Sequence, residues 1–332
     1  MGTVYVREQG AVVRLDGERL RVTLEHQEIG SVPFVELDQL ALMGNVQLTT
    51  PAAVKLLETG VDVIFMSKYG KFRGRLIHSG SRLAELRHRQ MQLASDDKTA
   101  LPVARAIVMA KVNNQRVVLM RRAERVPNAQ RALQGMLAMG HQAEGAGTLD
   151  SLRGFEGKAG AYYFEALRSL LPPDWGFQKR IYHPPTDPAN ALLSFGYTLL
   201  LKDVTAAIQV VALDSYIGFF HALGYDREAL ALDLMEEWRP VIVDAMLLEI
   251  VGDRRLEPRD FTASTASDRP CLLGEAGVRV VLDQYEQRLQ TPLSHALAGG
   301  QTTYRRAIEL QARQMARFIQ GKDPAYRPVW MK

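Results

Sequence analysis

The stretch FRGRLIHSGSRLAEL at residues 72–86 decides the fold, because the pattern of the sequence changes there. Before SGS at residues 79–81, apolar and polar residues alternate in short runs separated by turn signals, which is typical of β-strands. After it, apolar residues recur at helical spacing. The sequence therefore predicts an α+β protein, with a small β-rich N-terminal domain at residues 1–78, a linker at 79–81 and a larger all-α domain at residues 82–332.

The β-rich part contains one well-marked helix. Thr50 is a good N-cap, Pro51 suits the first helical position, and Gly60 suits the C-terminal stop. The run VDVIFM at residues 61–66 then indicates a buried strand. Past the linker, the apolar spacing predicts helices at residues 82–94, 103–122, 129–143, 151–171, 187–213, 227–251 with a bend or break near Pro240, 274–290 and 302–320.

The composition is that of an ordinary globular protein. A chain of 332 residues is too long for one small core and favours two domains. Hydrophobic residues make up 47%, which is enough for a packed interior. Lys and Arg number 41 against 37 for Asp and Glu, a net charge of +4, which permits a polyanionic partner without requiring one.

We expect a cytoplasmic protein without a membrane-spanning segment. Cys271 is the single cysteine, which excludes an intrachain disulfide and fits a reducing cytosol. Residues 2–15 carry charges and no apolar core of signal-peptide length. The apolar stretch 191–213 has Lys202 and Asp203 near its middle, which indicates a buried helix of a bundle.

Three polar clusters interrupt apolar helical stretches in the predicted helical part of the chain. They contain Glu156, His221 and the acidic run LDLMEEWRP at residues 232–240. Within that run, Asp233 and Glu236 share one helix face because they are three residues apart. Two carboxylates and an imidazole suit Mn²⁺ or Mg²⁺, whereas the cysteine-rich or multi-histidine spacing of tight zinc sites is absent from the sequence.

Each cluster also has a purely structural interpretation. The acidic run can be a solvated helix face, although its apolar neighbours indicate burial, where an unpaired carboxylate is costly. Glu156 can pair with Lys158 or Arg153 near the start of a helix. His221 can be a hydrogen-bonded core residue.

Five segments together resemble the CRISPR-associated endonuclease/integrase family, Cas-one, of CRISPR adaptation. The run at residues 232–240 is the strongest match, and DPANALLSFGY at residues 187–197 is also close. Residues 5–11, 42–50 and 60–66 are similar to the strands of the family's β-domain. The resemblance covers nearly the whole chain.

The resemblance implies a metal site of one Glu, one His and one further acidic residue. These fall on Glu156, His221 and Glu236, with Mg²⁺ or Mn²⁺ as the cofactor, and Asp233 is implied as an assisting acid. Members of the family use either Asp or Glu as the last ligand, so the choice between Asp233 and Glu236 stays open. Residues 221–227 are less rich in Pro and Arg than the family's usual loop, which leaves the contacts of that loop open.

The reaction implied is metal-dependent insertion of captured foreign DNA into a CRISPR array, in which a 3′-hydroxyl attacks a phosphodiester. Its partners would be DNA (a prespacer duplex, the leader and repeat, and branched DNA), a second copy bound through the β-domain, and a small ferredoxin-like CRISPR-associated protein. Candidate DNA contacts near the site are Lys158, Arg168, Arg180 and Tyr197. The basic side chains can equally be solvated, and the tyrosine can pack in the core.

Two other functions remain open. The same site could serve a structure-specific nuclease that cuts branched DNA in repair without integration. The acids could also do no more than pair with arginines in a non-enzymatic DNA-binding scaffold. A product assay separates the integrase from the structure-specific nuclease, because one joins strands and the other only cuts them. The effect of divalent ions separates both enzymes from the scaffold.

Overall fold

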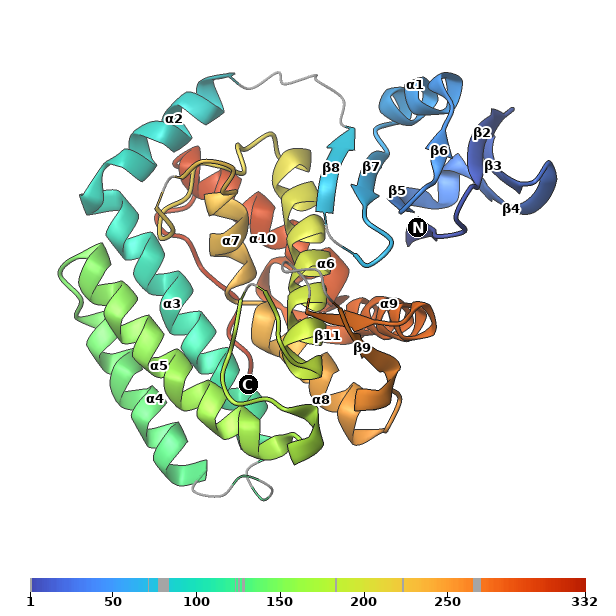
Figure 1. Ribbon diagram of the computed structural model, residues 1–332. Coiled ribbons are helices and arrows are strands. Elements are labelled where there is room, and N and C mark those ends of the chain that lie inside the picture. Colours follow the sequence, from blue (N-terminus) through green and yellow to red (C-terminus); the bar gives the residue numbers. More distant parts are fainter. Residues whose placement is uncertain are drawn as a thin grey trace. The chain divides into compact units, whose positions relative to one another are not determined.

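The computed structural model describes residues 2–70, 72–76, 84–122, 124, 126, 129–182, 184–222, 224–264 and 270–332. The chain divides into two compact units, Met1–Ser81 and Arg82–Lys332. The first is rich in strands and the second is mainly helical (Figure 1), which confirms the predicted α+β fold class. The predicted linker at 79–81 lies outside the described residues.

Two four-stranded sheets make up the described part of the first unit. One has the order β1 (Gly2–Val6), β5 (Leu37–Met43), β7 (Asp62–Met66) and β8 (Phe72–Leu76), with β8 antiparallel to β7 and the other neighbours parallel. The other has the order β4 (Gln27–Pro33), β3 (Arg19–Leu24), β2 (Val12–Asp16) and β6 (Gln47–Leu48), with β6 parallel to β2 and the other neighbours antiparallel.

The predicted helix of this unit is α1 (Thr50–Thr59), and it begins one residue earlier than predicted. Thr49 is the N-cap, without a side-chain cap bond, and Thr50 is the first helical residue. Gly60 ends the helix with a φ of 73°, a left-handed conformation that costs glycine little. Inward-facing side chains of the strands, among them Val13, Leu40 and Val63, form one apolar core with Leu56 of α1.

The second unit begins with a set of long helices. These are α2 (Ala84–Ser95), α3 (Asp97–Met120), α4 (Ala129–Glu144) and α5 (Leu149–Leu170). Of these, α3, α4 and α5 lie side by side, and α4 runs antiparallel to α3 and α5 (Figure 1). Asp96 caps α3 by accepting a hydrogen bond from the backbone N–H of Lys98, and Thr148 forms a capping box with Ser151 at α5.

Helix α6 (Pro188–Val210) passes through the core of this unit. Asp187 caps it by accepting from the N–H of Asn190, and Pro188 takes its first position. The helix is slightly shorter than the predicted range of 187–213. In the part of the chain that the structure describes, α6 alone is long and apolar enough to cross a membrane. Two thirds of its most apolar window, 67%, is buried inside the unit, which is typical of a core helix.

The single helix predicted at residues 227–251 is divided. Helix α7 (Ala229–Met235) is followed by a π-helical segment, Arg239–Asp244, and then by α8 (Ala245–Gly252). Pro240 explains the break, because it lacks an N–H and its ring clashes with the carbonyl one turn earlier. The π-helical segment begins three residues after Glu236, and segments of this kind are frequent at functional sites.

The helical unit is not purely α, which corrects the prediction of an all-α domain. Strand β9 (Phe261–Ala263) pairs with β10 (Cys271–Leu273), and β11 (Pro292–His295) pairs with β12 (Gly300–Thr303). Strands of three or four residues are too short to show a period of two against the helical pattern around them. Helices α9 (Glu275–Leu289) and α10 (Tyr304–Ile319) complete the unit.

Candidate active site

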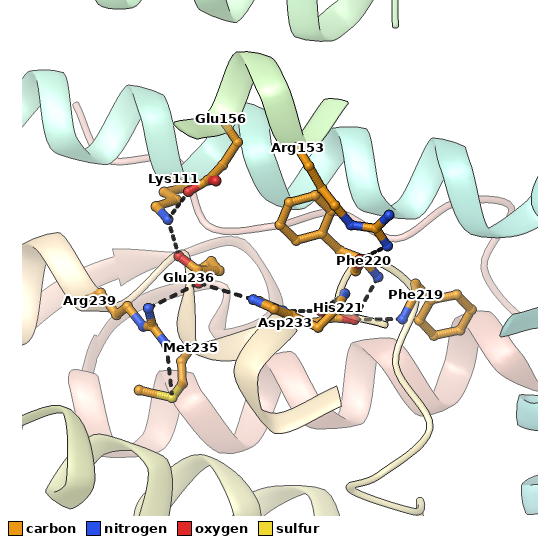
Figure 2. Close-up of polar contacts among 10 residues, drawn as sticks. All are labelled: Lys111, Arg153, Glu156, Phe219, Phe220, His221, Asp233, Met235, Glu236 and Arg239. Atoms are coloured by element: carbon orange, nitrogen blue, oxygen red, sulfur yellow. Dashed lines mark hydrogen bonds and ion pairs between the residues drawn. The ribbon is translucent and has the colours of Figure 1, made fainter. Parts of the chain in front are cut away.

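Four elements of the helical unit bring polar side chains to one point (Figure 2). They are α3 with Lys111, α5 with Glu156, the loop before α7 with His221, and the C-terminal end of α7 with Glu236. The three residues predicted as a metal site therefore converge from distant parts of the sequence. Lys111 was not predicted at all.

Asp233 builds the loop that carries His221. Its carboxylate is fully buried, and one oxygen, Oδ2, accepts the backbone N–H groups of Phe219 at 2.6 Å and Phe220 at 3.0 Å. The other oxygen, Oδ1, accepts the N–H of His221 at 2.9 Å and lies 2.7 Å from its Nδ1. Gly218 is required beside it, because a Cβ there would lie 2.7 Å from Oδ2.

This network fixes the orientation of the imidazole. A carboxylate next to Nδ1 favours the tautomer in which Nδ1 carries the proton, so the lone pair of Nε2 faces away from Asp233. Nε2 points towards Glu236, whose Oε1 lies 3.8 Å away. The loop is also held from α2, where the Gln90 side chain bonds the backbone of Asp214 and Ile217.

Glu236 is buried among cations. Its side chain is 3% exposed, its Oε1 lies 3.2 Å from Nη1 of Arg239, and its Oε2 lies 2.6 Å from Nζ of Lys111. Burial alone would raise the pKa of Glu236, but Arg239, Lys111 and His221 outweigh it and lower the pKa to about 2. Glu236 is therefore ionised at neutral pH.

Lys111 bridges the two glutamates. Its ammonium is ion-paired with Oε1 of Glu156 and with Glu236, and it lies between them (Figure 2). Burial would lower the pKa of Lys111, but the two carboxylates raise it above its ordinary value, so the amine stays charged. Of the two open structural interpretations of Glu156, neither holds, because Arg153 pairs with Asp150 and Glu156 pairs with Lys111.

The donor set fits a hard divalent cation. Glu156, Nε2 of His221 and Glu236 offer carboxylate oxygens and one imidazole nitrogen, which suit Mg²⁺ or Mn²⁺. Oε2 of Glu236 is buried and is ion-paired with Lys111. It accepts no hydrogen bond of regular geometry from the residues that the structure describes. As the side chains lie, no group of three or more His, Cys, Asp or Glu residues in the described ranges is close enough to enclose an ion. The ammonium of Lys111 lies between the carboxylates of Glu156 and Glu236.

A cleft of about 350 Å³ opens beside Glu156 and Lys111. Arg168 and Arg180, two of the predicted DNA contacts, line it together with Lys179. Lys158 is exposed on α5 but does not line this cleft.

Tyr197 has a different place from the one predicted for a DNA contact. It is 9% exposed, and its hydroxyl donates to Oδ1 of Asp244 at 2.6 Å. The guanidinium groups of Arg180 and Arg239 lie 5.2 and 5.0 Å from the centre of its ring. The ring of Tyr197 therefore packs against the guanidinium groups of Arg180 and Arg239 and is too buried to stack on a base.

Two site residues were missed by the reasoning from sequence. Arg239 lay inside the quoted acidic block but received no role. Lys111 lies in the apolar stretch of α3, where an amine on the buried face is a signal of a buried partner. The sequence could not name that partner, because Glu156 and Glu236 follow 45 and 125 residues later.

Comparison with known sequences identifies relatives over the full length. Residues 4–287 match the family described as "CRISPR associated protein Cas1". The chain is 36% identical to "CRISPR-associated endonuclease Cas1 1" of Thermus thermophilus, covering 99% of both chains. It is 34% identical to a "CRISPR-associated exonuclease Cas4/endonuclease Cas1 fusion" of Geobacter sulfurreducens, and it spans 59% of that longer protein.

Solved structures share the fold. A chain of a "Cas6-RT-Cas1--Cas2 complex" superposes on all of this chain with a TM-score of 0.85 and 25% identity, although only 36% of that longer chain is covered. A "Casposase bound to integration product" superposes with a TM-score of 0.86 at 22% identity, covering 98% of this chain and 93% of the other. The match to the family model and the identity to complete relatives together place this chain in the Cas1 family of CRISPR-associated proteins.

Proposed function

We propose that this protein is a metal-dependent DNA endonuclease/integrase that inserts captured DNA fragments into a CRISPR array by 3′-hydroxyl transesterification. One observation carries the proposal: Glu156, His221 and Glu236 converge from three separate elements, and Asp233 aims the imidazole at the same point. The relatives named as endonucleases and the similarity to a casposase bound to its integration product support it.

Glu156, Nε2 of His221 and Glu236 would hold the ion. Asp233 would orient His221 but would not itself bind the ion. All four lone-pair directions of Asp233 are already used by the loop, which favours Glu236 as the ligand. When bound, Mg²⁺ or Mn²⁺ supplies Lewis-acid stabilisation of charge on the reacting phosphate. Arg239 keeps Glu236 ionised and oriented beside it.

The cleft beside Glu156 would receive the DNA backbone. Arg168, Lys179 and Arg180 line it and would bind phosphates, which gives salt-dependent affinity. Gly157 and Gly160 of α5 also line it, and a Cβ at either position would meet open space. A backbone can therefore approach this face of α5 closely.

The protein would act in the cytoplasm as part of a larger assembly. The first unit would form a homodimer, and its exposed apolar side chains Ile29, Val35 and Val54 are compatible with an interface. A small protein partner is proposed by analogy with the solved complex whose name includes Cas1 and Cas2, and its ferredoxin-like fold is proposed from the family resemblance alone.

The test is a strand-joining assay. Purified protein is mixed with a short duplex, a supercoiled plasmid bearing a leader and repeat, and Mn²⁺ or Mg²⁺, with and without the small partner. We expect joining that requires the metal, and we expect His221→Ala to reduce it by at least about a hundredfold. Nicking without joining, even with the partner present, would instead indicate a structure-specific nuclease. No metal-dependent reaction on plasmid or branched DNA would indicate a scaffold.

A further inference from the structure

We propose that Lys111 is an internal counter-cation that neutralises the two metal-binding glutamates in the absence of an ion and leaves them when a divalent ion binds. The inference rests on the proposed function, because it assumes that Glu156 and Glu236 are ligands. It assigns to one lysine the control of metal affinity and, after displacement, a contact with the DNA phosphate.

The position of the amine is the first argument. Lys111 belongs to the buried polar residues of the unit and is 8% exposed. Its ammonium is paired with Glu156 on one side and with Glu236 on the other. Without a cation between them, the buried carboxylate of Glu236 and the partly exposed carboxylate of Glu156 would repel each other, and Glu236 would lack solvation. Lys111 thus does electrostatically what a metal ion would do.

The second argument is that the two cations exclude each other. Nζ of Lys111 lies 2.6 Å from Oε2 of Glu236, an atom to which it makes an ion pair but no regular hydrogen bond. An ion held at about 2.1 Å from the same carboxylates would lie within about 5 Å of the ammonium. Positive charges that close in a buried site repel strongly. Binding of the ion therefore favours movement of the amine away from the carboxylates.

The cleft gives the displaced amine a destination. Lys111 lines the same 350 Å³ cleft as Glu156, Arg168 and Lys179. A rotation about its flexible side chain would move the ammonium from the carboxylates towards the cleft, where the proposed DNA phosphate lies. A DNA phosphate would then neutralise the charge of Lys111 in place of the carboxylates of Glu156 and Glu236.

The first experiment uses the unmodified protein. Solvent-accessible amines are labelled with acetic anhydride, with and without saturating Mn²⁺, and each lysine is quantified by peptide mass spectrometry. We expect labelling of Lys111 to rise by about tenfold with Mn²⁺, because an amine released from the two carboxylates can turn into the open cleft that it already lines. Lys202, whose side chain is 1% exposed and paired with Asp203, should stay unlabelled, and exposed Lys179 should be labelled equally in both samples.

The second experiment measures the ion directly. Isothermal titration with Mn²⁺ should give a Kd for Lys111→Met that is at least about tenfold lower than that of the unsubstituted protein, because the competing charge is gone. The Tm of the variant should be lower without Mn²⁺ and rise more when it is added. Lys179→Met, which removes an amine from the same cleft but none from the glutamates, should leave the Kd unchanged.

The outcomes separate this inference from the proposed function. If neither protein binds Mn²⁺, the metal site itself is wrong. If both bind it with the same Kd, or if Lys111 stays protected while Mn²⁺ is bound, the metal site stands and the role of Lys111 is refuted. Should Lys111→Met fail to fold, the labelling of the unsubstituted protein decides.

Discussion

At the scale of single residues, Asp233 and Glu236 show how two acids on one helix acquire different tasks. Asp233 faces the loop and accepts bonds from three consecutive backbone N–H groups and from the imidazole. Glu236, three residues later, faces the cations Lys111 and Arg239. Which of the two acids can bind a metal depends on the direction in which each side chain points. The spacing of the two residues along the helix does not give that direction.

The first prediction concerns Asp233. An amide offers one accepting oxygen, and its NH₂ group would face backbone donors, so Asp233→Asn should lower the free energy of unfolding by about 1–3 kcal/mol. It should also reduce strand joining, because His221 loses its fixed orientation. Urea unfolding and the joining assay measure the two effects.

Asp150→Asn is the matched control for this substitution. Its side chain is 92% exposed and pairs with Arg153 on the surface, so the free energy of unfolding should change by less than about 0.5 kcal/mol. Equal stability losses in the two variants would contradict the structural role of Asp233.

At the scale of elements, the C-terminal segment is held beside the end of α7 that carries Glu236. Buried Asn114 of α3 donates to the carbonyls of Glu237 at 2.8 Å and Val329 at 3.0 Å, and it accepts from the N–H of Met331 at 2.9 Å. Glu237 accepts from the hydroxyl of Tyr326 and the N–H of Val329, both at 2.5 Å. The segment therefore holds the residue next to Glu236.

We predict that Asn114→Ala releases this segment. The loss of three buried hydrogen bonds should reduce the free energy of unfolding by about 1–3 kcal/mol and raise the rate of amide hydrogen exchange at Val329 and Met331. Exchange followed by mass spectrometry measures the second effect. Asn113→Ala is the comparison variant. The Asn113 side chain donates one bond to the segment, at the Met331 carbonyl, and one to Asn114, so its removal should raise the exchange rate less than Asn114→Ala does. Unchanged exchange in Asn114→Ala would mean that apolar packing, not Asn114, holds the segment.

The elements also show how far the sequence predicts the fold. Long helices such as α5 and α6 were predicted because their apolar period persists over many turns. Pro240 indicated the break but not the π-helical geometry, which depends on how the chain packs after it. The pairing of Lys111 with Glu156 was beyond prediction, since charge complementarity between separate helices leaves no local pattern.

At the scale of the whole molecule, the candidate site belongs to one unit. Lys111, Glu156, His221, Glu236 and Arg239 all lie in Arg82–Lys332. The three tryptophans of the chain, Trp175, Trp238 and Trp330, also lie there. Tryptophan fluorescence in urea therefore follows the unfolding of the helical unit alone, which permits a test of its electrostatics.

Asp244, like Glu237, is a buried carboxyl whose titration should make that unit less stable as pH rises. It is 1% exposed, and its carboxyl accepts bonds from the hydroxyls of Tyr163 at 2.8 Å and Tyr197 at 2.6 Å. Burial raises its pKa from 3.8 to about 6, because those hydrogen bonds and the nearby Arg180 and Arg239 compensate only in part.

The sign of the effect follows from proton binding. Between pH 4 and 6, the folded unit holds a proton on Asp244 that the unfolded chain has released, so the free energy of unfolding falls as pH rises through this window. The raised pKa corresponds to up to about 3 kcal/mol, fully present below pH 4 and lost above pH 7. Asp244→Asn removes this titration. The free energy of unfolding of the unsubstituted protein minus that of Asp244→Asn should therefore fall by up to about 3 kcal/mol between pH 4 and 7 and stay constant above pH 7. A constant difference from pH 4 to 7 would show that Asp244 is already ionised in the folded protein, in which case the two tyrosines and two arginines, not burial, control its charge.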